Sequence, residues 1–359
     1  MKSYYRRYTA LKKTIVIVLA VALLLALCAA GCGKSGSNGE VNVYNWGEYI
    51  DESIFDDFEK ETGIKVNYST YSSNEILYSN MQTGAANYDV IIPSDYLISR
   101  LIAEDMLEKI DFSNVPNYDL IDDAYKNLEY DPTGEYSVAY MTCTVGLIYN
   151  TSMISEEITS WGAMFDPRYE GQILMFDNSR DAMCIALKYL GYSANTTDEA
   201  ELNAAYELLD SQRPLLQGYV MDQIFDKLES GEAAIGPYYS GDYLTMLENN
   251  PDLAFVIPDE GSNYSVDAMC IPKGAENKAN AEAFINFMCR TDVSIANMDY
   301  IYYTSANKEA AAEYAEDLDD LSREIMFPSR EVMDRCEVYV NLPQDTLDLY
   351  NTLWIKLKA

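Results

Sequence analysis

Carboxylates and aromatic side chains gather directly after the predicted strands of this chain, where basic residues are nearly absent. In open α/β sheets, ligands bind at the carboxyl ends of the strands. Carboxylates form charge-assisted hydrogen bonds to ammonium groups, and aromatic faces cover methylenes and attract cations. The pattern therefore predicts a site for an organic ammonium ion. Its candidate residues are Trp46, Gly47, Glu48, Tyr49, Ser94, Asp95, Tyr96, Asp177, Asn178, Asp181, Tyr238, Tyr239, Asp242 and Asp267.

Each position also has a purely structural interpretation. Trp46 and Tyr49 are compatible with a place in the core or at its rim. Asp181 and Asp242 fall where helices are expected to start, so each can simply stabilise the positive end of a helix dipole. Asp267 is harder to explain this way, because its neighbours imply a half-buried strand in which an unpaired carboxylate is costly. The set as a whole favours binding of a cation.

The composition excludes several classes of function. The chain after residue 31 carries 58 acidic and 20 basic residues, a formal charge of −38. Such a charge repels phosphate backbones, which argues against nucleic-acid binding and favours a cationic ligand. The chain has no histidine, which rules out Ser-His-Asp, Cys-His and histidine-ligated zinc mechanisms. No metal-ligand spacing such as an EF-hand loop occurs, and no cofactor is expected.

Strands and helices alternate in the segment that carries the first candidate residues. Hydrophobic spacing and glycine stops predict three strands, each followed by a helix. The strands are residues 41–45, 64–71 and 88–92, and the helices run over about 50–63, from Ser73 to Gly84 and through 97–102. This succession predicts a parallel sheet covered by helices.

A second group of β/α units follows a long extended segment. Residues 142–150 alternate like a strand long enough to carry the chain from one lobe to another. The further predicted strands are 172–176, 233–236 and 265–271, and the further helices are 181–190, one from Asp242, 279–288 and 344–358. Two α/β lobes joined by crossing segments fit this order best, and no internal repeat is present.

The N-terminus has the features of an export signal. Basic residues lie between positions 2 and 13, and an apolar run of 13 residues follows from Ile15 to Leu27. That run has the length of a signal-peptide core and is short for a membrane span. Together with small residues before Cys32 it resembles a bacterial lipoprotein signal, residues 1–31, whose cleavage leaves Cys32 lipidated. An uncleaved anchor is the alternative. Residues 32–40 are a flexible tether rich in Gly and Ser.

Five cysteines follow Cys32, with no CxxC spacing. An odd number cannot pair completely, and four of the five lie in apolar stretches. Buried free thiols are therefore expected rather than disulfides or a metal site. These residues are Cys143, Cys184, Cys270, Cys289 and Cys336.

Several ordered motifs resemble one known family. They are YNWGEYI at 44–50, ETGIKV at 61–66, YSTYSSNE at 68–75, YDVIIPS at 88–94, LGYSANTTD at 190–198, Asp267 with Ile271-Pro272, INF at 285–287 and RTDV at 290–293. In this order the motifs resemble the spermidine/putrescine-binding proteins of polyamine ABC transporters. The resemblance covers about residues 41 to 310.

The resemblance implies a type II periplasmic-binding fold, in which two α/β lobes close by a hinge over an interlobe ligand cleft. Residues 41–142 and 268–312 are expected to form lobe 1, and residues 143–267 and 313–359 lobe 2. The positions that match ligand contacts of the family are Trp46, Tyr49, Ser94, Tyr96, Asp181, Tyr239, Asp242, Asp267 and Tyr303. Tyr239 stands where the family usually has Trp. The chain also departs from the family pattern at Gly47, Asn178 and Ser265, which leaves the identity of the polyamine open.

Three functions follow as hypotheses. The first is a monomeric, lipid-anchored receptor outside the cytoplasm that passes putrescine or spermidine to a permease driven by a cytoplasmic ATPase. The second is a receptor for another organic amine or small cation. The third is an extracellular hydrolase that uses two carboxylates. With 58 acidic residues such carboxylate pairs are unavoidable, so the chain is expected not to be an enzyme.

Overall fold

A computed structural model describes residues 38–84 and 87–359 of the chain. The predicted signal peptide, Cys32 and most of the predicted tether lie outside these residues. Among the described helices, none combines the length and the apolar character needed to cross a bilayer. The strands are β1 (Glu40–Trp46), β2 (Lys65–Tyr71), β3 (Val90–Ile91), β4 (Leu107–Glu108), β5 (Ser137–Asn150), β6 (Ile173–Phe176), β7 (Leu216–Val220), β8 (Ile235–Tyr239), β9 (Leu253–Val256), β10 (Tyr264–Pro272) and β11 (Thr304–Ser305).

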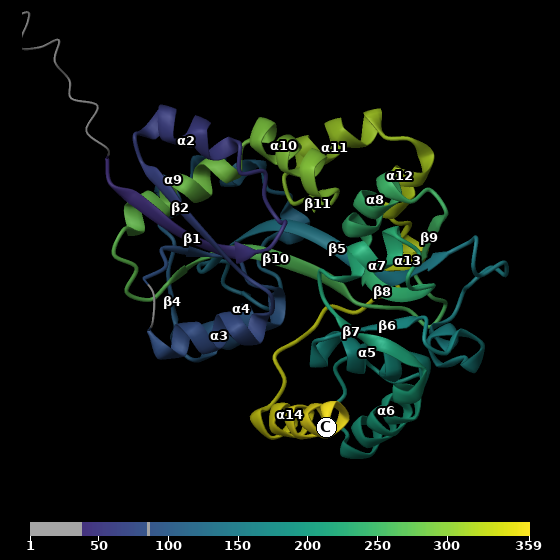
Figure 1. Cartoon of the computed structure of the whole chain (residues 1–359). Helices are drawn as coiled ribbons and strands as arrows, with labels where there is room; N and C mark the ends of the chain where they lie inside the picture. The colour runs from purple at the N-terminus through teal and green to yellow at the C-terminus, as the bar shows by residue number, and fades with distance from the viewer. Residues whose placement is uncertain (1–37, 85–86) are drawn as a thin grey trace, which may run out of the picture.

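Helices surround the strands (Figure 1). They are α2 (Ile54–Thr62), α3 (Asn74–Thr83), α4 (Asp95–Ala103), α5 (Ser179–Tyr189), α6 (Glu199–Gln212), α7 (Ile224–Glu229), α8 (Ser240–Asn249), α9 (Lys278–Met288), α10 (Thr291–Ile301), α11 (Lys308–Asp317), α12 (Asp320–Met326), α13 (Arg330–Met333) and α14 (Gln344–Lys358).

The described strands form one mixed sheet whose main path is β2-β1-β3-β10-β5-β8-β6-β7. The first three strands pair in parallel, as the alternation of strands and helices predicts. β10 is antiparallel to both of its neighbours on this path, β3 and β5. Helices α2 and α9 cover one face of the β1–β3 half, and α3 and α4 cover the other (Figure 1).

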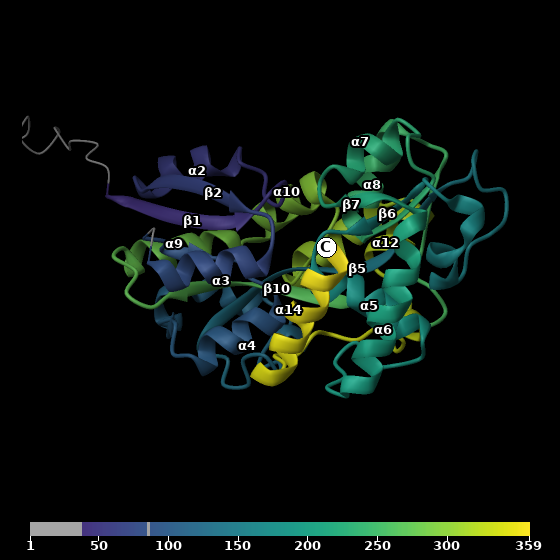
Figure 2. The same ribbon diagram turned by 60° about the horizontal axis from the view of Figure 1, so that its bottom comes forward.

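Strand β5 joins the two halves of the sheet. Its first part, from Ser137 to Thr144, pairs with β10, and its second part, from Val145 onward, pairs with β8 and β9. All 14 of its residues are buried, including the polar Ser137, Thr142, Thr144 and Asn150. The predicted strand 142–150 is correct but starts five residues too late. Figure 2 shows α14 beside the junction of the two halves, between α4 and α5.

Glycine stops and capping residues place some helix boundaries where the sequence predicts them, while other boundaries are shifted by a few residues. Gly63 closes α2 with a left-handed φ of 71°, a conformation that costs glycine little. The Ser73 hydroxyl caps α3 by accepting a hydrogen bond from the Ile76 amide. Helix α2 begins at Ile54 rather than near Ile50, because Ile50 is buried in the loop before it. Strand β8 lies at 235–239, two to three residues later than predicted.

The cysteine prediction is confirmed for the described residues. All five described cysteines are free thiols, and Cys336 alone among them is half-buried rather than buried. Burial raises the pKa of the Cys184 thiol to about 12 and that of Cys289 also to about 12. These thiols therefore behave as small hydrophobic side chains in the core.

Candidate functional site

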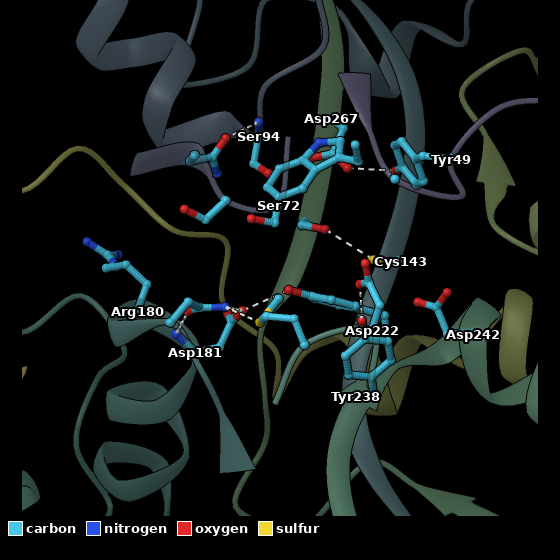
Figure 3. A pocket seen from close by; sticks show the side chains of 18 of the residues that line it. Tyr49, Ser72, Ser94, Cys143, Arg180, Asp181, Asp222, Tyr238, Asp242 and Asp267 are labelled. Atoms are coloured by element: carbon cyan, nitrogen blue, oxygen red, sulfur yellow. Dashed lines mark hydrogen bonds between the residues drawn. The ribbon is translucent and has the colours of Figure 1, made fainter. Parts of the chain in front are cut away.

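A cleft lies where the two halves of the sheet meet (Figure 3). Its empty volume is about 950 Å³, which includes space that is open to solvent. Loops that follow β1, β3, β6 and β8 supply much of its lining, as the rule for carboxyl ends of strands predicts. The structure brings together all ten residues expected to bind ligand. They are Trp46, Tyr49, Ser94, Tyr96, Asn178, Asp181, Tyr239, Asp242, Asp267 and Tyr303.

The last residue of β1 and the loop after it build one wall. The Trp46 indole Nε1 donates a hydrogen bond of 2.9 Å to the carbonyl of Ile92, which fixes the ring beside Tyr71. Glu48 has a positive φ of 47° and turns the chain sharply after β1. Tyr49 is buried and packs edge-on against Tyr303, with ring centroids 5.0 Å apart. This wall is aromatic and rigid.

Asp267 lies at an irregularity in β10, where the register against β5 shifts between Asp267 and Ala268. Such bulges commonly re-aim a side chain beside a functional site. The Tyr49 hydroxyl donates a hydrogen bond of 2.6 Å to Oδ2 of Asp267. Oδ1 is buried and receives no hydrogen bond of normal geometry from the described residues. An ammonium group in the cleft would supply the missing donor.

Burial raises the pKa of Asp267 to about 6, although the nearby Ser94 and Tyr49 hydroxyls act in the opposite direction. Asp95 lies behind it, and burial raises the pKa of Asp95 to about 8. Burial therefore favours the protonated form of Asp95 more strongly than that of Asp267. Asp95 and Asp177 are absent from the cleft lining, so the structure separates these two from the other candidate residues. Asp177 instead forms an ion pair of 2.7 Å with Lys358.

The opposite wall holds Asp181 in the first turn of α5. Asn178 caps this helix, because its Oδ1 accepts from the Asp181 amide at 2.8 Å while its Nδ2 donates to Asp181 Oδ2 at 2.7 Å. The Tyr239 hydroxyl donates to the same oxygen at 2.9 Å, and the Tyr339 hydroxyl donates to Oδ1 at 2.8 Å. Asp181 is therefore held by three side-chain donors, in addition to its place at a helix N-terminus.

Asp242 occupies the first turn of α8 and accepts a 2.6 Å hydrogen bond from the Tyr303 hydroxyl. Tyr303 reaches it because Tyr302 turns the chain with a φ of 56°, and because Gly241 has no side chain. A Cβ at Gly241 would lie 2.1 Å from the Tyr303 ring. Burial raises the pKa of Asp242 to about 7, with the hydrogen bond from Tyr303 opposing the shift.

Several lining residues escaped the sequence reasoning, and Asp222, Tyr339 and Arg180 are the most informative of them. Asp222 follows β7, a strand that was not predicted, so the rule that found the other residues was never applied there. Tyr339 lies in a segment without helix or strand, and no local pattern marks it. Arg180, next to Asp181, is the one basic residue in the lining and is buried among the rings of Tyr96, Tyr339 and Tyr350.

The residues that line the cleft are mainly acidic and aromatic. Its lining holds six carboxylates and nine aromatic rings against one guanidinium group. The carboxylates are Glu48, Glu75, Asp181, Asp222, Asp242 and Asp267. No group of His, Cys, Asp and Glu within the described part of the chain is arranged to hold a metal ion. The arrangement is suited to an organic cation with an apolar chain between its charges.

Known proteins are similar to this chain in sequence and in fold. The family model described as bacterial extracellular solute-binding protein matches residues 53–321. The spermidine/putrescine-binding periplasmic protein of Salmonella typhimurium is 34% identical over 351 residues, covering 96% of this chain and 97% of its own. The putrescine-binding periplasmic protein SpuD of Pseudomonas aeruginosa is 31% identical, with 94% and 97% covered.

Solved structures agree with this relationship. A putative spermidine/putrescine ABC transporter protein from Listeria monocytogenes has a TM-score of 0.83 and 38% identity, covering 89% of this chain and 98% of its own. The predicted fold, two α/β lobes around a ligand cleft, is confirmed by these structures. A protein with this fold and with relatives of this kind is a periplasmic-binding receptor. The chain belongs to the bacterial extracellular solute-binding protein family. It is a receptor and not an enzyme.

Proposed function

We propose that this protein captures a polyamine, putrescine or spermidine, in the interlobe cleft and delivers it to the permease of an ABC importer. The observation that carries the proposal is the buried Asp267, whose Oδ1 lacks a donor and faces a cleft rich in carboxylates and aromatic rings. Relatives named for spermidine and putrescine binding support the same ligand class. A receptor for another organic amine is the second candidate, because the same cleft chemistry suits any such cation.

The ligand contacts are part of this proposal. The ten residues predicted from the sequence bind the polyamine, with the carboxylates of Asp181, Asp242 and Asp267 holding ammonium groups. Residues 41–142 and 268–312 move as lobe 1, and residues 143–267 and 313–359 move as lobe 2. The protein acts as a monomer, and its permease partner is driven by a cytoplasmic ATPase. The aromatic walls of the cleft cover the methylenes of the ligand.

Polyamines should stabilise the protein against heat. A ligand that binds only the folded state adds about 2.7 kcal/mol at a hundredfold excess over Kd, which raises Tm by about 4 °C for a chain of this size. Thermal melts with putrescine, spermidine, spermine and agmatine measure the effect. Lysine methyl ester, a cation of different shape, is the control. If none of the four amines raises Tm at millimolar concentration, the proposed function is wrong.

Cys32 should carry lipid and tether the protein to the outer face of the cytoplasmic membrane. The basic leader, the apolar run of 13 residues and the Gly/Ser tether motivate this expectation. The mature protein should begin at Cys32, should sediment with membranes and should have a mass above that of the unmodified chain. Cys32→Ala should block processing or release the protein. An unmodified Cys32 at the mature N-terminus would contradict the expectation.

A further inference from the structure

A second cavity adjoins the ligand cleft. Its empty volume is about 850 Å³, which includes space that is open to solvent. Helices α3 and α4 line it from one side, and α5 and α14 line it from the other. Four residues line both this cavity and the cleft, namely Asn74, Glu75, Tyr96 and Arg180. A long ligand that binds in the cleft can therefore extend past these residues into the second cavity.

The charge of the lining reverses between the two spaces. The cleft has six carboxylates and one guanidinium group. The second cavity has two guanidinium groups, those of Arg100 and Arg180, and one carboxylate, that of Glu75. Its other lining residues carry amide, hydroxyl or apolar side chains. An ammonium group is therefore stabilised by charge in the cleft but not in the second cavity.

Arg180 lies at the boundary between the two spaces, and its charge is not neutralised there. It is 4% exposed. Its Nη2 donates a hydrogen bond of 3.3 Å to Oδ1 of Asn195, while Nε and Nη1 have no hydrogen-bond partner in the described part of the chain. No carboxylate within residues 38–84 and 87–359 forms an ion pair with it. The full positive charge of Arg180 therefore acts on any ligand that passes this point.

Three tyrosine rings hold the guanidinium in place. The Cζ atom of Arg180 lies 4.6 Å from the ring centroid of Tyr339, 5.1 Å from that of Tyr96 and 5.5 Å from that of Tyr350. Such contacts fix the position of a cation without cancelling its charge. Figure 3 shows the Arg180 side chain extending away from Asp181 and Asp242, so the guanidinium is not held by the carboxylates that are expected to bind ammonium groups.

Glu75 is the one carboxylate that lines both spaces, and its effect is the weaker one. It is exposed, and its Oε1 accepts a hydrogen bond of 3.1 Å from the Tyr96 hydroxyl. Water screens the charge of an exposed carboxylate, whereas a buried guanidinium acts through a medium of lower dielectric constant. For an ammonium group that moves beyond Asp181, repulsion by Arg180 therefore exceeds attraction by Glu75.

We propose that Arg180 is a specificity-determining residue that ends the ammonium-binding region at Asp181. A polyamine whose chain extends into the second cavity is then bound well only if the extending end is uncharged. The inference rests on the proposed function, because it concerns the ligand of the same cleft. It adds to that function a limit on the length and on the terminal charge of the amine.

Spermine and N1-acetylspermine test the inference, because they share one chain and differ by one terminal charge. Calorimetric titration of the full-length chain in detergent should show that N1-acetylspermine binds about 5-fold more tightly than spermine. Arg180→Met removes the charge and keeps an unbranched apolar side chain against the tyrosine rings. It should shift the ratio of the two affinities about 10-fold in favour of spermine, as expected for the loss of one charge repulsion.

Two further variants separate the charge of Arg180 from its packing. Arg180→Lys keeps the charge and should keep the preference for N1-acetylspermine. Arg330→Met is the matched control, because Arg330 is an exposed residue of α13 outside both linings. It should leave the ratio of affinities within about 2-fold.

Several results would overturn the inference. The first is a wild-type chain that binds spermine at least as tightly as N1-acetylspermine, a comparison that needs no variant to fold. The second is an equal loss of both affinities in Arg180→Met, which would make Arg180 a structural residue. The third is failure of N1-acetylspermine to bind a chain that binds spermidine. If the wild-type chain binds neither putrescine nor spermidine, the proposed function itself fails.

Discussion

Asp267→Asn should weaken polyamine binding by about 30- to 3000-fold, the largest effect of any single substitution in the cleft. Removing one partner of a desolvated charge pair costs about 2–5 kcal/mol, because the other charge stays buried and unpaired. Asp267 is 6% exposed, and its Oδ1 has no hydrogen-bond donor within the described part of the chain. Asparagine keeps the shape of the side chain and deletes the charge. Calorimetric titration with putrescine and with spermidine measures the loss.

Two controls separate binding from folding in this experiment. Asp56→Asn removes an exposed acid on α2 and should leave the affinity nearly unchanged. The Tm of the empty Asp267→Asn protein should not fall, because burial disfavours the carboxylate that is removed. If Asp267→Asn lowered the Tm while the folded protein kept its affinity, Asp267 would be a structural residue and its assignment to the ligand would be withdrawn.

Polyamine affinity should fall about 10- to 800-fold when the pH is lowered from about 7.5 to about 5. Burial raises the pKa of Asp267 to about 6 and that of Asp242 to about 7. Over this range the ionised fraction falls about 10-fold for the first group and about 80-fold for the second, while the amines stay protonated. The lower figure applies if Asp267 alone must ionise, and the higher one if both must.

Calorimetry in buffers of different ionisation enthalpy checks this expectation, because binding should release protons near pH 6.5. The groups that face the two carboxylates are Ser94, Tyr49, Asp95 and Asp181 for Asp267, and Tyr303, Asp222 and Glu48 for Asp242. None of them is a cation that would hold either carboxylate ionised in the empty cleft. Equal affinities at the two pH values would show that both carboxylates are already ionised before the ligand binds.

The raised pKa values of Asp267 and Asp242 also affect the stability of the folded protein, which falls as the pH rises, whereas the ligand affinity rises. A carboxyl whose pKa is raised in the folded state contributes stability that is fully present below its unfolded pKa and is lost as pH rises through the folded value. The empty protein should therefore lose stability from Asp267 and Asp242 between about pH 4 and pH 8. Saturating polyamine should remove this loss, because the bound ammonium groups stabilise the ionised carboxylates. Thermal melts with and without ligand separate the two cases.

Several strands and helices and most of the predicted site residues could be located from local sequence patterns. Periodicity and glycine stops located β1, β2 and β3 with their helices, and α14 was predicted over its observed range, 344–358. The rule that ligands collect after strands then selected nine of the ten predicted residues, and the family resemblance supplied Tyr303. These inferences succeed because strand ends and helix starts are encoded locally, within a few residues of each candidate.

Other features of the site have no local signal. Strand β7 was missed because its five residues include Gly218 and show no alternation of buried and exposed positions, and Asp222 was lost with it. Tyr339 acts through a hydroxyl that meets Asp181, 158 residues earlier in the chain. No window of sequence contains both partners of such a contact, so only the folded chain identifies it.

The tertiary structure also decided which carboxylates can accept a ligand. In the sequence Asp267 already stands apart from Asp181 and Asp242, because its neighbours imply a half-buried strand in which an unpaired carboxylate is costly. In the fold Asp181 accepts three side-chain hydrogen bonds, whereas an irregularity in β10 leaves an oxygen of Asp267 buried and without a donor. The pKa and the free hydrogen-bonding capacity of a carboxylate depend on neighbours that β5 and β10 bring together from distant parts of the chain. That dependence on long-range contacts is the reason the sequence located the acids and favoured Asp267, but could not identify the donors that satisfy Asp181 or the oxygen of Asp267 that has none.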